Sequence, residues 1–181
     1  MTCALTKGYD FNGCKGGAGG IKRVLITEAA NITAYTLTAN IITAITLPTG
    51  KQFREYKLDA EMGMAESPFT GDPKTDNMTW AHKVMFTIKK FTTSMAAELK
   101  LVASNWTVAI VEDRNGTYRA YGLGTALSKS NFLQMVSAGD STGTAMADFN
   151  GFADITLQST EDNFAYECNS SIITALLSPA S

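Results

Sequence analysis

The residues most suggestive of chemistry form the glycine-rich stretch FNGCKGGAGGIKRVLIT, residues 11–27. Glycine-rich loops bind phosphate when a strand leads into the loop and a helix follows it. The spacing here fits neither nucleotide-binding pattern, because Ile21 stands at the second glycine of a P-loop and Lys22 at the third glycine of a dinucleotide fingerprint. The glycines also precede a strand-like run. We therefore expect no nucleotide site and interpret Gly16–Gly20 as a hinge.

Two groups of carboxylates could act as acid–base pairs or metal ligands. Glu112 and Asp113 are adjacent on a predicted strand near a hairpin tip, so their side chains point to opposite sides and we expect both to be solvated. Asp148, Asn150 and Asp154 loosely resemble a calcium loop, but the glycine comes at the fourth position where an EF-hand has it at the sixth. Turn formation explains the same residue types, and we expect no metal site.

The histidine and the cysteines offer no catalytic arrangement. His82 is the only histidine and shares an apolar strand face with Trp80, so we expect a structural role for it. Cys3, Cys14 and Cys168 are too few and too scattered for a zinc site. A disulfide between Cys3 and Cys14 is one alternative, and free thiols are the favoured one. The sequence therefore predicts no enzyme activity and no cofactor.

The overall composition is that of a folded protein without a nucleic-acid-binding charge pattern. The chain has 181 residues, of which 45% are hydrophobic and 18% charged. This length suits one domain with a substantial core. The net charge of -2 argues against a general nucleic-acid binder. The first ten residues lack the apolar segment of a signal peptide, and no apolar run is long enough for a membrane span, so we expect no membrane anchor.

Period-two alternation dominates the chain and predicts a mainly β fold, an antiparallel β-sandwich or barrel-like structure. An Asn-Gly pair at Asn115 predicts a hairpin between two of the strands. One α-helix is predicted over about residues 92–105, inserted between strands, because apolar residues there recur at helical spacing. The predicted strands lie at 21–27, 34–47 (two strands broken near Asn40), 51–62, 78–90, 106–111, 118–123, 131–138, 152–159 and within 163–177.

Three segments are predicted to lie outside this framework. Residues 1–20 form a flexible glycine-rich N-terminal arm, and residues 21–181 a single β-rich structural domain. Residues 63–77 and 139–151 are predicted to be long loops, because glycine, proline and polar residues are concentrated there. Loops of this length in a compact domain are usually functional or mobile.

Two stretches of the chain resemble a known group of proteins. One is the predicted helix followed by WTVAIVEDRNGTYRAYGLGTAL, and the other is STGTAMADFNGFADITLQSTEDNFAYE, with the pattern S-T-G-x-x-x-x-D-x-N-G-F before a strand. Both resemble virion structural proteins of tailed bacteriophages, of the tail-tube and head-to-tail connector type found in phages of Bacteroidetes-like hosts. The N-terminal segment, in which a glycine-rich arm leads into a strand near a Gly-Ile pair, is also similar to that group.

The resemblance implies a self-assembling homo-oligomer of the virion tail or neck, with stacked rings that form a tail tube. Its partners would be further copies of itself and other tail proteins, and viral DNA would pass through without specific binding. The alternatives are a connector ring or a head decoration protein and, from another class, a surface carbohydrate-binding module. Apolar residues in the arm and in the 63–77 segment, together with a strand tryptophan, are the expected subunit-interface residues: Leu5, Tyr9, Phe11, Met64, Phe69 and Trp80.

Overall fold

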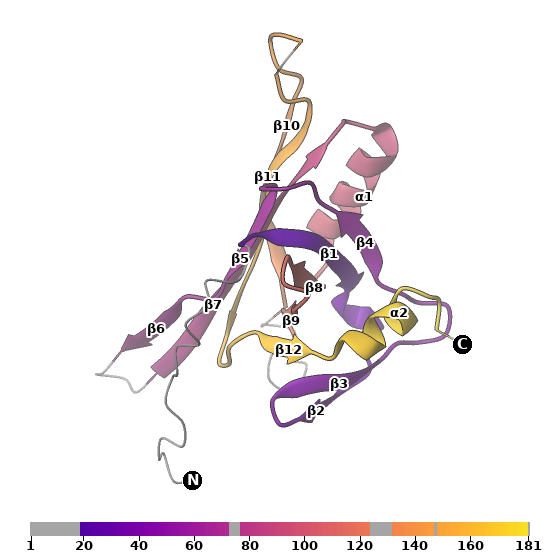
Figure 1. Cartoon of the computed structure of the whole chain (residues 1–181), viewed down its shortest axis with the longest axis vertical. Coiled ribbons are helices and arrows are strands. Elements are labelled where there is room, and N and C mark those ends of the chain that lie inside the picture. The colour runs from indigo at the N-terminus through magenta and orange to yellow at the C-terminus, as the bar shows by residue number, and fades with distance from the viewer. Residues whose placement is uncertain (1–18, 73–76, 124–131, 147, 181) are drawn as a thin grey trace.

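The computed structural model describes residues 19–72, 77–123, 132–146 and 148–180. It confirms the predicted fold class, because the chain is mainly β and its strands form two sheets (Figure 1). One sheet, here called sheet A, forms the body of the molecule. The other, sheet B, is a long band that crosses the body and extends beyond it at both ends.

Sheet A has seven strands, in the order β2-β3-β12-β9-β8-β1-β4. All neighbours are antiparallel except β12 and β3, which are parallel. The strands are β1 (Ile21–Glu28), β2 (Ala34–Thr38), β3 (Ile41–Thr46), β4 (Arg54–Lys57), β8 (Thr107–Asp113), β9 (Tyr118–Tyr121) and β12 (Tyr166–Cys168).

Sheet B has the order β10-β11-β7-β5, and β6 also pairs with β7 beyond the end of β5. All of its pairs are antiparallel. Its strands are β5 (Gly63–Glu66), β6 (Phe69–Asp72), β7 (Asn77–Lys89), β10 (Gln134–Ser141) and β11 (Gly151–Glu161). At one corner a two-way backbone pair between Thr107 and Leu133, at 2.9 Å in each direction, links this band to sheet A.

The main core lies between the two sheets. Val24 and Ile26 of β1 face Val84 and Phe86 of β7 across it, and all four side chains are buried. Leu25, between the first two, points to the opposite side of sheet A and is also fully buried. Central strands covered on both faces have continuous apolar sequences. This explains why β1 and β8 show no alternation between polar and apolar residues.

A second core fills the other face of sheet A. A short 3-10 turn (Ser170–Ile172) and the helix α2 (Ile173–Leu176) cover it, burying Ile173 and Leu176 against Leu25 and Ile42. The Phe53 amide donates a hydrogen bond to the Leu176 carbonyl at 2.8 Å. The C-terminal segment is therefore held against sheet A by this hydrogen bond and by the second core.

The predicted helix is present as α1 (Thr93–Ser104). The Thr92 hydroxyl accepts a hydrogen bond from the Met95 amide at 3.2 Å, which is the usual N-cap arrangement. Leu99 and Val102 are buried in the main core, so the helix closes one open side of the sandwich.

Two predicted segments differ from the structure. The expected loop 63–77 is wrong, because β5 and β6 occupy most of it and keep one register along β7. The interruption falls at Pro68, whose carbonyl accepts from the Ala81 amide at 3.0 Å but which has no N–H to return the bond. The expected strand 51–62 is also too long, since only Arg54–Lys57 pairs with a neighbour.

The structure also differs from the prediction in the loop 139–151 and in the region 163–177. The predicted loop 139–151 is shorter than expected, because β10 continues to Ser141 and β11 begins at Gly151. The region 163–177 contains one three-residue strand and then helical turns, so α2 is a second helix that the sequence did not predict. Its four residues are too few to show a helical period.

Two glycines with the same backbone conformation provide a test of close packing. Gly122 has φ +81°, and a Cβ there would lie 2.8 Å from Leu133 Cγ and 3.0 Å from the Thr107 carbonyl oxygen. Gly116 has φ +82° but has nothing within 4 Å of the Cβ position. We expect Gly116→Ala to cost about 1–2 kcal/mol for the left-handed conformation alone. Gly122→Ala should cost more, because the sheet junction must also move. Urea unfolding of the two variants measures the difference, and equal losses would contradict it.

Candidate functional site

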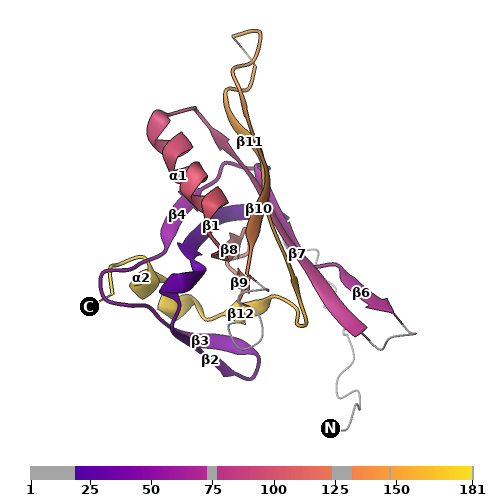
Figure 2. The same cartoon turned by 180° about the vertical axis from the view of Figure 1, so that it is seen from behind.

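The most conspicuous surface feature is the end of sheet B that projects beyond the body, residues 69–72 and 77–80, here called the protruding hairpin. Figures 1 and 2 show it from opposite sides as β6 and the start of β7 extending away from sheet A. Its strands pair with each other, but no part of sheet A lies beneath them. The side chains that would face a core elsewhere along β7 are therefore left open here.

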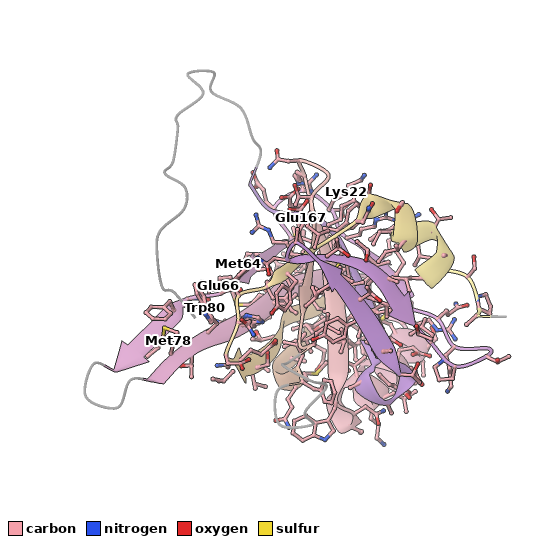
Figure 3. The ribbon with its side chains drawn as sticks, turned by 90° about the horizontal axis from the view of Figure 1, so that it is seen from below. Lys22, Met64, Glu66, Met78, Trp80 and Glu167 are labelled. Atoms are coloured by element: carbon pink, nitrogen blue, oxygen red, sulfur yellow. The ribbon has the colours of Figure 1, made fainter. Side chains whose placement is uncertain are left out.

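These open side chains form an apolar surface. Phe69 is 53% exposed and Met78 65% exposed, although both share the face of β7 that carries the buried Val84. Phe69 packs on Trp80 with ring centroids 5.2 Å apart, and Trp80 meets Phe164 at 6.3 Å. Figure 3 shows Met78 and Trp80 along the hairpin. Exposed apolar patches of this kind usually mark interaction surfaces.

The structure brings together only part of the predicted interface set. Phe69 and Trp80 are in direct contact in the protruding hairpin. Met64 is 44% exposed but pairs with Met85 across the ladder, so it lies on the opposite face of sheet B. Leu5, Tyr9 and Phe11, and the hinge residues 16–18, lie outside the described residues.

The opposite face of sheet B, here called the outer face, has no other element of the described chain packed on it. Both views show the body on one side of the band only. Residues directly opposite one another in a ladder share a face, and this register defines the outer face. Threonine, glutamine and methionine are its commonest residues, and its members are Met64, Glu66, Thr79, Ala81, Lys83, Met85, Gln134, Ser137, Thr156, Gln158 and Thr160.

The lysines of β7 are paired with carboxylates. Lys83 Nζ lies 3.7 Å from Glu66 Oε1, and both residues belong to the outer face. Lys89 Nζ, at the end of the same strand, lies 2.9 Å from Asp59 Oδ2. The outer face is therefore polar but has no excess of positive charge along this strand.

Both lateral edges of sheet B are open in the part of the chain that the structure describes. On one side β10 pairs only with β11, and on the other β5 and β6 pair only with β7. The Thr87 amide donates to the Met62 carbonyl at 2.9 Å, and the Ala81 amide to the Pro68 carbonyl at 3.0 Å. Because hydrogen-bonding direction alternates along an antiparallel strand, Ala65 and Phe69 point their backbone groups away from β7. Such an edge is a template for another strand.

A groove of about 580 Å³ lies beneath the open edge of β5, between the two sheets. Its lining includes Ala65, Ser67, Tyr121 and Phe164, and Phe164 also contacts Trp80 of the protruding hairpin. A smaller hollow of about 240 Å³ continues it to Gly19 and Gly20 and shares Ala65 and Tyr121 with it. The groove thus runs from the start of the described chain to the base of the hairpin.

His82 is fully buried beside a buried carboxylate. Its Nε2 lies 3.0 Å from the Asn163 carbonyl oxygen, which can only accept, so Nε2 carries a proton. Its Nδ1 lies 2.9 Å from Glu161 Oε1, at ion-pair distance but without the alignment of a hydrogen bond. The same carboxylate oxygen accepts from the Gly122 amide at 2.7 Å and from the Ser159 hydroxyl at 2.9 Å. This cluster ties β7, β9 and β11 together inside the core.

Glu112 is buried, so the expectation that it is solvated at a hairpin tip is wrong. Its carboxylate accepts hydrogen bonds from Lys22, at 2.9 Å, and from Arg23. Arg23 also donates to Glu55 at 2.6 Å and to the Tyr118 hydroxyl at 2.8 Å. Burial alone would raise the pKa of Glu112, but the hydrogen bonds from Lys22 and Arg23 outweigh it and hold the pKa below its ordinary value.

The lowered pKa of Glu112 predicts a pH dependence of stability. A carboxylate with a depressed pKa in the folded state stabilises the fold above its ordinary value of 4.5, and that contribution is lost as the pH falls through the folded value. Glu112→Gln should cost about 1–3 kcal/mol at pH 7, as for hydrogen bonds to charged groups. It should cost less at pH 3. Urea midpoints at both pH values, with Glu66→Gln as the more exposed control, test this; a pH-independent loss would contradict it.

Asp113 and Asp148 both stabilise turns. Asp113 Oδ1 accepts from the Asn115 and Thr117 amides, at 2.8 and 2.9 Å, in the hairpin predicted around Asn115. Asp148 Oδ2 accepts from the Thr144 amide at 2.6 Å and from its hydroxyl at 2.9 Å. These hydrogen bonds lower the pKa of Asp148. Asp148 thus has the turn role that the sequence favoured over calcium binding.

The cysteine and metal chemistry of the described chain is limited. Cys168 is a free, buried thiol, and its burial raises its pKa to about 12. Cys3 and Cys14 lie outside the described residues. Within the described ranges, no three histidine, cysteine or carboxylate side chains gather in a way that could hold a metal ion. The candidate functional site is therefore a set of surfaces: the protruding hairpin, the outer face, the open edges and the groove.

Comparisons with known proteins add no relative. No family model, no curated protein and no solved structure matches the chain. Among the described residues, no helix has the length and apolar character needed to cross a membrane.

Proposed function

We propose that this chain is a virion structural protein, a tail-tube subunit that assembles with further copies of itself into rings and stacks them into a conduit for DNA. The observation that carries the proposal is the open sheet B: the strand at each lateral edge has a neighbour on one side only, and one face has no cover among the described residues. A monomer with two open edges is prone to uncontrolled association. A ring in which each subunit's sheet continues into the next removes both edges.

The two edges differ, which favours a ring over a symmetric dimer. One edge is β10 and the other is the β5–β6 strand with the protruding hairpin. A contact between unlike surfaces repeats from subunit to subunit and closes when the rotation allows it. The sheets B of all subunits would then form a continuous barrel-like wall. The outer face of sheet B, which points away from the body of each subunit, would line the channel of the ring.

The chemistry of the outer face suits a lining past which DNA moves. Phosphate binding by proteins depends on unpaired lysine and arginine charges. On this face Lys83 is paired with Glu66, and the remaining side chains are mainly threonine, glutamine and methionine. Such a wall would allow DNA to pass without holding it.

Electron microscopy and sedimentation of the purified full-length protein test the proposal. We expect rings or open-ended tubes whose formation rises with protein concentration and needs no nucleic acid. Single rings that never stack would favour the connector alternative, and binding only to assembled heads would favour a decoration protein. A protein that stays monomeric at all concentrations would contradict self-assembly. Glycan binding by that monomer would favour the carbohydrate-binding alternative.

A further inference from the structure

We infer that the groove beneath β5 binds residues 1–18 of the N-terminal arm of a neighbouring copy of the chain. The inference rests on the proposed function, because it assigns a second contact between subunits of the same assembly. It concerns the groove and not the sheet edges, so both contacts can form at once.

The groove has the size and lining of a peptide-binding site. Its volume of about 580 Å³ lies within the roughly 300–1,000 Å³ range of binding pockets. Ala65, Tyr121 and Phe164 are among its lining residues, and Phe164 is 44% exposed. Ser67 and Arg119 supply hydrogen-bonding groups. An extended segment that presents apolar side chains on one face would fill such a site.

The arm has the matching sequence pattern. In the segment LTKGYDF, residues 5–11, the side chains of Leu5, Tyr9 and Phe11 fall on one face of an extended chain. Lys7 lies on that face as well. No other stretch of the chain outside the described residues combines two aromatic residues with this alternation.

Charged side chains of both signs lie on the arm and around the groove. The arm carries Lys7 and Lys15 against Asp10. The groove is bordered by Glu66 and Glu167 against Arg119. Figure 3 shows Glu66 beside Trp80 at the base of the hairpin and Glu167 farther over the body. Because Lys83 of the outer face lies 3.7 Å from Glu66, the charges around the groove nearly balance, and the assignment depends mainly on the apolar pattern of the arm.

The spacing favours a neighbouring copy over the chain's own arm. Gly19 lies eight positions after Phe11, and an extended chain spans about 26 Å over eight steps. The strand β5 has four residues, or about 13 Å. The chain's own arm, continuing along β5 from Gly19, would lay its glycines in the groove and carry Phe11 beyond it. If the glycine-rich segment instead spans the distance to a neighbouring subunit, the apolar residues of the arm can reach that subunit's groove.

Disulfide trapping between separately purified chains tests the assignment. In a Cys3→Ser, Cys14→Ser background, the remaining native thiol, Cys168, is buried and protonated. Chains carrying Tyr9→Cys are mixed with chains carrying Ser67→Cys and oxidised gently. A cross-linked dimer that needs both substitutions is expected. The matched control replaces Ser67→Cys with Ser178→Cys, an exposed serine near α2, and should lose the cross-link.

The outcomes separate this inference from the proposed function. Assembled rings or tubes without the mixed disulfide overturn the groove assignment and leave the tube subunit intact. A disulfide that forms only within a chain carrying both cysteines shows that the groove holds its own arm, and overturns the inference. A mixed disulfide in a protein that never forms rings supports the groove contact and contradicts the proposed function.

Discussion

A chain in which alanine replaces Glu161 is expected to lose about 1–3 kcal/mol of folding free energy for each of the two buried donors, the Gly122 amide and the Ser159 hydroxyl, that lose their acceptor. The carboxylate accepts from the Gly122 amide and the Ser159 hydroxyl and faces His82. All of these groups lie in the core, away from bulk water. A loss of this size is a large part of the 5–15 kcal/mol that typically stabilises a domain.

Two controls separate this cluster from a general effect of removing a glutamate. Glu167→Ala removes an exposed carboxylate six residues further along the chain and should change stability little. Glu161→Gln keeps an acceptor for the Gly122 amide and should fall between the two. Urea unfolding followed by circular dichroism measures all three. Equal unfolding midpoints for Glu161→Ala and Glu167→Ala would contradict the role assigned to the cluster.

The same cluster defines what His82 does. The sequence placed it on an apolar strand face, and the structure shows it fully buried in that position. His82→Gln should therefore affect stability or assembly, with no loss of a chemical activity. An activity lost while fold and assembly persist would contradict this.

The spacing of apolar residues predicted those strands and helices that are buried on one side and exposed on the other. β7 alternates because Val84 and Phe86 face the core while Lys83 and Met85 lie on the outer face. The helix α1 was predicted for the same reason, since Leu99 and Val102 make one buried side. The class of the fold followed from such patterns.

Periodicity failed where tertiary partners decide the conformation. Pro68 and the surrounding glycines predict a loop, but pairing with β7 holds β5 and β6 as strands in one register. Glu112 looked solvated because Asn115 marks a turn only three residues later. Its burial depends on Lys22 and Arg23, which are about 90 positions away in the chain. Local sequence contains no signal for partners at that distance.

The candidate site was predicted only in part for a related reason. Phe69 and Trp80 were expected at an interface; the structure places them in contact, with Phe69 53% exposed, and their role as interface residues stays a prediction. The open edges and the uncovered outer face depend on strand order, which a single sequence does not encode in a readable pattern. The expectation for the arm residues Leu5, Tyr9 and Phe11 stays a prediction.

The second large effect is expected for assembly, from Phe69→Lys. Phe69 is 53% exposed in the single chain, so a lysine there can remain solvated and the fold should persist. In the proposed ring the same position is covered by a neighbour. Each subunit contact would then bury an unpaired ammonium group, which costs several kcal/mol. A loss of about 3 kcal/mol per contact raises the concentration needed for assembly on the order of 100-fold.

Phe91→Lys is the matched control for this variant. Phe91 is 49% exposed and packs on Phe152 at 5.1 Å, much as Phe69 packs on Trp80 at 5.2 Å. Both substitutions remove one ring contact, worth about 0.5–1.5 kcal/mol, and both add one positive charge. Only Phe69 belongs to the protruding hairpin, at the open edge of sheet B. Sedimentation of the two variants over a range of concentrations should show assembly by Phe91→Lys and monomers for Phe69→Lys. Assembly of both at the wild-type concentration would show that the protruding hairpin does not contact a neighbour.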